Sequence, residues 1–153
     1  MPEREREIKE MATLYVMIGI PGSGKSTFAK EHPEMNVVCP DKIRQELFGD
    51  AENQEQGRKV FQIAFNRARK LLDAGQDVIF DSTNVRRKYR KDYFKKFPDV
   101  SKVAIFVNTS IDECKRRNAG RDRKVSDAVI DRMAKNLNPP TYDEGWQEII
   151  EIS

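Results

Sequence analysis

The chain has 153 residues, with 28 lysines and arginines against 25 aspartates and glutamates, and its formal net charge is +3 at pH 7. This length fits one globular domain, and 38% hydrophobic residues are enough to fill one core without disulfides. No apolar run approaches the roughly 20 residues of a membrane-spanning helix, so we expect no membrane segment.

Residues 1–12 carry charges of both signs and lack the apolar stretch of a secretory signal. We therefore expect a charged N-terminal segment over 1–12, one domain over 13–153 and a cytoplasmic location. Cys39 and Cys114 lie far apart, with no CxxC motif or Cys/His cluster near either, which favours incidental thiols over a metal site.

Short apolar runs rich in β-branched residues predict strands over 13–18, 78–80 and 103–107, because a parallel strand covered on both faces reads as a continuous apolar run. Residues 37–38 predict a short further strand, and the alternation over 148–152 predicts a final edge strand. Helical periodicity predicts helices over 25–31, 41–48, 54–74, 86–97, 111–118 and 127–135. This alternation predicts a three-layer α/β fold with a mostly parallel sheet and ligand sites at the carboxyl ends of its strands.

The segment after the first predicted strand reads GIPGSGKST over 19–27, which matches G-x-x-x-x-G-K-[ST] in the strand–loop–helix context that this phosphate-binding motif requires. The alternative is a glycine-rich turn that happens to hold a lysine. Gly22 and Gly24 permit backbone angles barred to other residues, so successive N–H groups can surround a phosphate at the start of the next helix.

The motif predicts a nucleoside triphosphate and Mg²⁺ as ligands. Lys25 would reach the β and γ phosphates, and the hydroxyl of Ser26 would bind Mg²⁺. The full nucleotide-binding set predicted in the loop is Gly22, Ser23, Gly24, Lys25, Ser26 and Thr27.

Asp41 and Arg44 follow the second predicted strand, and their spacing places them on one face of the next helix. A carboxylate at a strand end can accept the proton of an attacking hydroxyl, and such assistance typically contributes 10²–10⁴-fold. The alternatives are an N-cap role for Asp41 and a solvated position for Arg44.

Asp81 ends the third predicted strand, in the sequence DSTN. An acid at this point of a P-loop fold commonly contacts Mg²⁺, directly or through water, or orients an arginine. The alternative is a second helix cap. The sequence lacks the apolar run followed by Asp-Glu that P-loop motors commonly use, which disfavours hydrolysis-driven machinery.

An arginine-rich stretch around Gly120 separates two predicted helices. P-loop kinases often close such a lid over the triphosphate, because charge develops on the transferred group and arginine binds phosphate in a fixed fork. The alternative is a basic solvated loop. The candidate lid residues are Arg116, Arg117, Arg121 and Arg123.

These segments together resemble the kinase domain of 5′-polynucleotide kinases, of both the bacteriophage type and the animal DNA-repair type. The matching pieces are GIPGSGKST, DKIR, DSTN, RNAGR and NPPTYDEGWQEIIEI, and they span nearly the whole chain after residue 12. The resemblance implies a three-layer P-loop kinase fold with an Arg-bearing lid. It also implies Mg²⁺-dependent transfer of the γ phosphate of ATP, or of another nucleoside triphosphate, to the 5′-hydroxyl end of DNA or RNA.

The resemblance also implies residue roles. Asp41 would be the general base for the 5′-hydroxyl, and Arg44 would hold the phosphate next to the acceptor nucleoside. Arg117 and Arg121 would contact the donor triphosphate, with Asp81 supporting the metal or Arg44. The Asp-x-Asp-x-Thr motif of the 3′-phosphatase domain of bifunctional relatives does not occur in the sequence, so 3′ end-healing is not predicted.

Two other functions remain open at this point. A kinase of a small metabolite, nucleoside or nucleotide would use the same loop, base and lid, whereas a nucleotide-binding switch would make Asp41 merely a cap. Trp146 is expected in the core rather than stacked on a base with Tyr142. The oligomeric state and the choice between DNA and RNA are not predicted. One basic cluster is either a duplex-binding surface or the solvated face of a helix, and its members are Arg86, Arg87, Lys88, Arg90 and Lys91.

Overall fold

A computed structural model describes residues 12–49, 57–121 and 125–153. Its sheet has five strands in the order β2-β3-β1-β4-β5, and all four neighbouring pairs are parallel. The three-layer α/β prediction is therefore confirmed, and every carboxyl end lies at one edge of the sheet. The strands are β1 (Thr13–Ile18), β2 (Asn36–Val38), β3 (Val78–Phe80), β4 (Ser101–Val107) and β5 (Glu148–Ile152).

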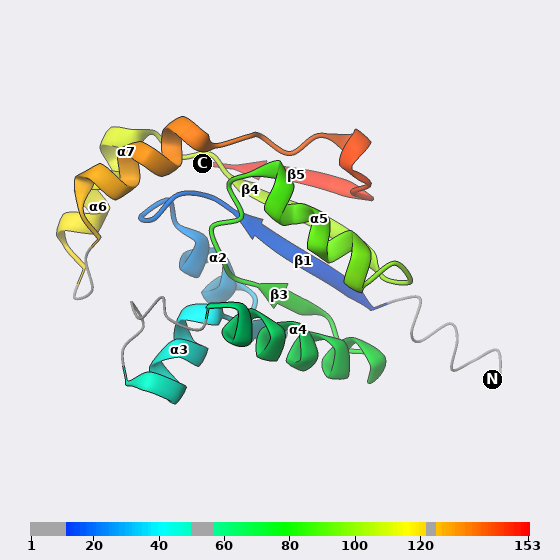
Figure 1. The fold of residues 1–153 in the computed structure, drawn as a ribbon. Helices are drawn as coiled ribbons and strands as arrows, with labels where there is room; N and C mark the ends of the chain where they lie inside the picture. Colours follow the sequence, from blue (N-terminus) through cyan, green and yellow to red (C-terminus); the bar gives the residue numbers. More distant parts are fainter. Residues whose placement is uncertain (1–11, 50–56, 122–124) are drawn as a thin grey trace, which may run out of the picture.

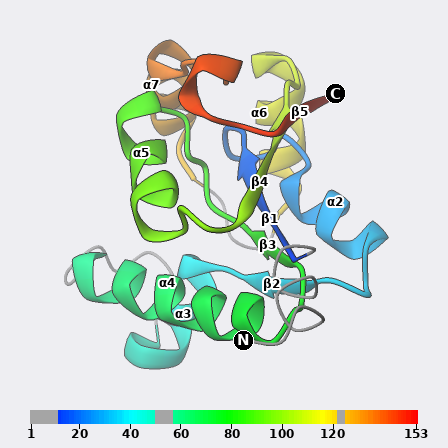
Figure 2. The same ribbon diagram turned by 90° about the vertical axis from the view of Figure 1, so that its right-hand side faces the viewer.

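Helices cover both faces of this sheet (Figures 1 and 2). One face packs against α3, α4 and α5, the opposite face packs against α2, and the pair α6 and α7 lies beyond the carboxyl ends of the strands. The helices are α2 (Lys25–Glu31), α3 (Pro40–Phe48), α4 (Gly57–Asp73), α5 (Arg87–Lys96), α6 (Ile111–Ala119), α7 (Asp127–Asn136) and the 3₁₀ turn η1 (Tyr142–Glu144).

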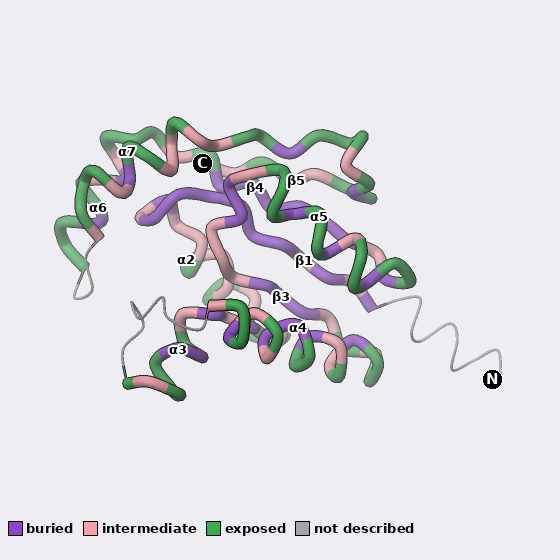
Figure 3. Tube along the Cα trace, in the orientation of Figure 1, coloured by how far each residue is buried: buried purple, intermediate pink, exposed green. Residues whose placement is uncertain are grey.

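The larger core lies between the sheet and α4 and α5. Figure 3 shows most of β1, β3 and β4 as buried and shows α4 and α5 with buried and exposed stretches in alternation, whereas the edge strand β5 is intermediate or exposed. Phe65 of α4, Phe80 of β3 and Tyr93 of α5 meet there with ring centroids 5.1–5.6 Å apart. Trp146 is 4% exposed and packs edge-on against Phe94, so the prediction that it belongs to the core is confirmed.

The predicted boundaries differ from the observed ones where tertiary contacts or caps extend an element. α3 begins at Pro40, because Cys39 is the N-cap and proline at the first helical position has no N–H that needs a partner. β4 begins at Ser101 and continues the pairing with β1. The predicted start of the long helix at 54 and the charged segment before residue 12 lie outside the described residues. In the described part of the chain, no helix has the length and apolarity to cross a membrane.

Candidate active site

The phosphate-binding loop connects β1 to α2 at the carboxyl edge of the sheet. Gly22 and Gly24 have φ values of +81° and +110°, in the region that glycine adopts without steric cost. A Cβ added to Gly22 would lie 2.4 Å from the carbonyl oxygen of Cys114, so this turn of the loop packs directly against the backbone of α6. Only glycine satisfies both the backbone angle and the close contact at this position.

The side chain of Lys25 is hydrogen-bonded to the backbone at the start of the phosphate-binding loop. Its Nζ donates to the carbonyl oxygens of Gly19 and Ile20, both at 3.0 Å. Burial lowers the pKa of the Lys25 ammonium, and the carboxylate of Asp81 opposes that effect. The hydroxyl of Ser23 is buried and has no hydrogen-bond partner among the described residues. The ammonium therefore lies at the loop before any phosphate arrives.

Asp41 and Arg44 form an ion pair on the first turns of α3. The Arg44 Nη1 donates to Asp41 Oδ1 at 2.6 Å, and the arginine residue is 7% exposed. Its Nε has no hydrogen-bond partner among the described residues, and its Cζ lies 5.8 Å from the centroid of the Phe61 ring. Because Cys39 is the N-cap of α3, the interpretation of Asp41 as a cap is wrong. Arg44 is likewise not a solvated helix residue.

Asp81 lies at the end of β3, beside the loop lysine. Burial raises the pKa of the Asp81 carboxyl, while the Lys25 ammonium lowers it and the Asp41 carboxylate raises it further. The cap of the following helix α5 is Arg86, so Asp81 does not cap that helix. The carboxyl edge of the sheet thus brings Lys25, Asp41 and Asp81 within electrostatic range of one another.

Asn84 holds the segment that follows Asp81 against the phosphate-binding loop. It is the one non-glycine residue with positive φ in the described part of the chain, at +50°. Its Nδ2 donates to the carbonyl of Met17 at 2.8 Å, and its Oδ1 accepts from the hydroxyl of Tyr93 at 2.8 Å. The N–H of Gly19 in turn donates to the carbonyl of Thr83 at 3.0 Å. Asn84 was not among the predicted site residues, although Asn is common at positive φ.

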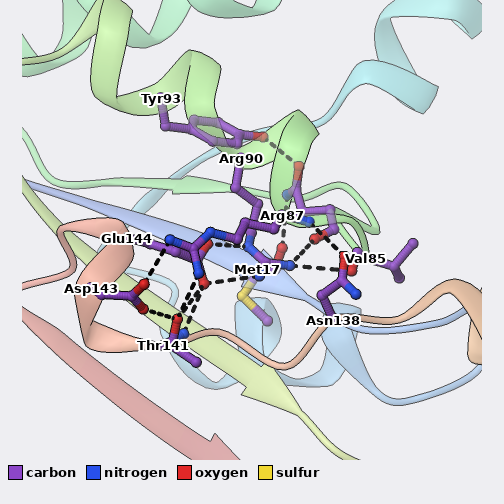
Figure 4. Close-up of polar contacts among 10 residues, drawn as sticks. Met17, Val85, Arg87, Arg90, Tyr93, Asn138, Thr141, Asp143 and Glu144 are labelled. Atoms are coloured by element: carbon purple, nitrogen blue, oxygen red, sulfur yellow. Dashed lines mark hydrogen bonds and ion pairs between the residues drawn. The ribbon is translucent and has the colours of Figure 1, made fainter.

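A buried ion pair connects the segment after Asp81 to the C-terminal part of the chain (Figure 4). Arg90 is fully buried and donates through Nε and Nη2 to the carboxylate of Glu144, at 2.7 and 3.0 Å. Its Nη1 donates to the carbonyls of Asn84 and Val85. Arg90 is therefore a core residue, and the interpretation of the whole basic cluster as a surface is wrong at this position.

The candidate lid arginines differ in what they contact and in how exposed they are. Arg117 donates through Nη1 to the carbonyl of Ser23 at 3.0 Å and through Nε to Glu113, so it lies directly on the phosphate-binding loop. Arg116 pairs with the same glutamate, and its side chain is 73% exposed. Arg121 lines the cleft with Arg117. Arg123 lies outside the described residues.

One cleft of about 2360 Å³ joins these groups. Oxygen donors suit Mg²⁺, which binds proteins through one or two carboxylates together with substrate phosphates. Ser26, which carries a hydroxyl, and Asp81, which carries a carboxyl, both line this cleft and fit that chemistry. Apart from the candidate lid residues Arg116 and Arg123, its lining includes the predicted site residues, namely Gly22, Ser23, Gly24, Lys25, Ser26, Thr27, Asp41, Arg44, Asp81, Arg117 and Arg121.

Comparison with known proteins places the chain among P-loop folds. A transcription factor from Arabidopsis thaliana, bHLH140, is 25% identical over 162 residues, which cover 97% of this chain and 17% of that protein. A chain of the Pnkp1/Rnl/Hen1 RNA repair complex superposes with a TM-score of 0.76 at 21% identity, covering 84% of this chain and 44% of that one. A gluconokinase from Sinorhizobium meliloti 1021 superposes with a TM-score of 0.61 at 16% identity, covering 93% and 82%.

The chain spans only a small part of the plant relative and less than half of the RNA-repair chain. At these identities the two structures establish a common fold. The sequence profile of the AAA domain family matches residues 14–140, from the first strand past the end of α7. Because this match includes the phosphate-binding loop together with α6 and α7, the protein belongs to the AAA domain family and is a P-loop kinase-like domain.

Proposed function

We propose that this protein is a Mg²⁺-dependent polynucleotide kinase, which transfers the γ phosphate of ATP or another nucleoside triphosphate to the 5′-hydroxyl end of DNA or RNA. The observation that carries the proposal is the Asp41–Arg44 pair at 2.6 Å, which lines the same cleft as Lys25 and Asp81. A switch protein has no need of a carboxylate and a buried guanidinium across from its phosphate-binding loop.

The residues divide the transfer between a donor side and an acceptor side. On the donor side, the loop N–H groups and Lys25 hold the β and γ phosphates, while Arg117 and Arg121 offset the charge that develops on the transferred group. Ser26 and Asp81 would hold Mg²⁺, which would offset the negative charge of the phosphates. The lid contact of Arg117 with Ser23 supports this assignment, since it already places a guanidinium at the loop.

On the acceptor side, Asp41 accepts the proton of the 5′-hydroxyl. The acceptor oxygen then bonds to the γ phosphorus as the bond from that phosphorus to the bridging β–γ oxygen breaks, and the nucleoside diphosphate leaves. Arg44 orients the Asp41 carboxylate through Nη1 and lines the cleft in which it would bind a phosphate of the acceptor. An acceptor phosphate next to the reacting nucleoside is a feature of nucleic acids and not of sugars.

The test is transfer of radiolabelled γ phosphate from ATP to defined acceptors. We expect labelling of oligonucleotides with a 5′-hydroxyl and no labelling of the same oligonucleotides with a 5′-phosphate. Lys25→Ala should lose most turnover together with nucleotide binding, whereas Asp41→Asn should lose turnover and keep nucleotide binding. Better labelling of mononucleosides or sugars than of oligonucleotides would refute the nucleic-acid assignment and favour a small-metabolite kinase.

A further inference from the structure

We propose that the groove between α4 and α5 binds the unpaired nucleotides of a single-stranded acceptor, with a base stacked on Tyr89, opposite Phe61, and phosphates near Arg58 and Lys96. This inference rests on the proposed function and adds to it the path and the strandedness of the acceptor. The four residues line the same cleft as Asp41 and the phosphate-binding loop.

Aromatic rings form the floor of the groove. α4 and α5 lie over the same face of the sheet, and both begin at its carboxyl edge (Figure 1). Phe65 and Tyr93 meet across the two helices with centroids 5.6 Å apart, and both rings rest on Phe80. Buried rings therefore close the bottom of the groove between the two helices, and the space above them is continuous with the active site.

The walls carry two further aromatic side chains, of which Phe61 packs against Phe80 of the core and Tyr89 is exposed. Phe61 is half-buried, lines the cleft and lies one turn before Phe65 on α4, nearer to the active site. Tyr89 lies one turn before Tyr93 on α5 and is 55% exposed. An aromatic face that lines a nucleotide-binding cleft can stack on any base, because every base has a π face.

Cations accompany these rings along the groove. Arg44 lies over Phe61 at 5.8 Å and Lys96 over Phe65 at 5.4 Å, each measured to the ring centroid. Positive side chains thus line the cleft beside aromatic rings, as a strand that presents both phosphates and bases requires. Asp92 also lines the α5 wall, between Tyr89 and Lys96, which keeps phosphates toward the two ends of that wall.

The contacts define a continuous path from the reacting hydroxyl. A phosphate held by Arg44 lies at the start of the groove, because the guanidinium lies over the Phe61 ring on the α4 wall. Further phosphates then reach Arg58 at the start of α4 and Lys96 at the end of α5. Paired bases cannot stack on side chains in this way, since their faces are already covered by neighbouring pairs, so the groove selects single strands.

The first test measures binding of a fluorescent oligothymidylate with a free 5′-hydroxyl by anisotropy. Tyr89→Ala should weaken binding by about 5- to 150-fold, the range expected for loss of one stacked base, and Tyr89→Phe should restore it. Tyr142→Ala is the matched control, because Tyr142 is 62% exposed and does not line the cleft. Lys96→Ala should lower the slope of log affinity against log salt by about 0.7, whereas Lys95→Ala, which is exposed outside the cleft, should affect binding less.

Equal affinity of Tyr89→Ala and the wild-type protein for the oligothymidylate would overturn the inference, as would an equal loss on blunt duplex DNA. A wild-type protein that binds no oligonucleotide would overturn the inference and the proposed function together. The second test compares phosphate transfer to a dinucleotide and to an octanucleotide, where Tyr89→Ala should reduce kcat/KM mainly for the longer acceptor. Binding that depends on Tyr89 without any phosphate transfer would refute the proposed kinase function but not the binding of a strand in the groove. Phosphate transfer that is unaffected by Tyr89→Ala would refute only the proposed role of the groove.

Discussion

Replacement of Glu144 by glutamine should remove a large part of this domain's free energy of unfolding, because it leaves a charge in the core without its partner. The carboxylate of Glu144 is 4% exposed and accepts two hydrogen bonds from Arg90, whose side chain is 0% exposed. After the substitution the guanidinium keeps only the carbonyls of Asn84 and Val85 and a weaker amide oxygen.

The expected loss is about 3–5 kcal/mol in the free energy of unfolding, the cost of removing one partner of a buried ion pair. Against a typical total of about 5–15 kcal/mol this is a large fraction. At about 2–4 °C per kcal/mol for a domain of this size, the melting temperature should fall by about 6–20 °C. Replacing both residues with apolar side chains of similar volume should recover much of that loss, since neither charge then remains buried.

The assay is urea denaturation followed by circular dichroism, with thermal melting as a second measure. Arg87→Gln is the control, because it breaks the neighbouring Arg87–Asp143 pair at 2.8 Å, which joins the same two elements but is exposed to solvent. That variant should stay close to wild type, since solvent-exposed ion pairs contribute little. Equal effects of Glu144→Gln and Arg87→Gln would refute the reasoning from burial.

The pH dependence gives an independent check on the same pair. Burial opposes ionisation of Glu144, but hydrogen bonds from Arg90 and from the Thr141 N–H outweigh it and hold the pKa of Glu144 below its ordinary 4.5. A carboxyl with a depressed pKa in the folded state stabilises above its unfolded pKa, and this contribution is lost as the pH falls through the folded value. Wild type and Glu144→Gln should therefore differ most above about pH 4.5 and converge in acid.

Three further substitutions test the rest of the site. Gly22→Ala should cost more than the 1–2 kcal/mol of the left-handed backbone, because its Cβ would meet the Cys114 carbonyl at 2.4 Å. In thermal melts the loss for Gly22→Ala should exceed that for Gly49→Ala, where φ is also positive but, among the described residues beyond its chain neighbours, no atom lies within 4 Å of an added Cβ. Equal losses would contradict the clash. Asn84→Ala leaves the Met17 carbonyl and the Tyr93 hydroxyl without their partner, which should cost about 1–3 kcal/mol of stability for each. It should also reduce turnover per folded molecule, and turnover equal to wild type would show that Asn84 does not contribute to the site. Arg44→Ala should lower kcat/KM by about 10- to 150-fold on oligonucleotides and less on a bare nucleoside, and equal losses would contradict its contact with an acceptor phosphate.

Much of the fold was predictable because its signals are local. The buried parallel strands read as apolar runs, since each is covered on both faces, and β1 and β3 were predicted to the residue. The spacing of Asp41 and Arg44 likewise placed both on one side of a helix turn, and the structure pairs them at 2.6 Å. What the residues do to a substrate stays a prediction, since geometry alone tests no reaction.

The basic run on α5 shows where local reasoning failed. Its composition is typical of a solvated helix face or of a nucleic-acid surface, and for Arg87 a surface position is correct. Arg90 is buried because Glu144, 54 positions later, is carried back over α5 by the segment before β5. No window of neighbouring residues contains that partner.

The sequence by itself determined the strand–loop–helix of the phosphate-binding motif, the alternation of strands and helices, and the candidate residues at the strand ends, because these depend on chain geometry and on neighbours a few positions away. Only the tertiary structure decided that α6 packs onto the Gly22 backbone, that Arg90 lies in the core, and that α4 and α5 enclose an aromatic groove. These features arise where segments distant in the chain exclude water together, so their free energy belongs to the assembled fold rather than to any one stretch of residues.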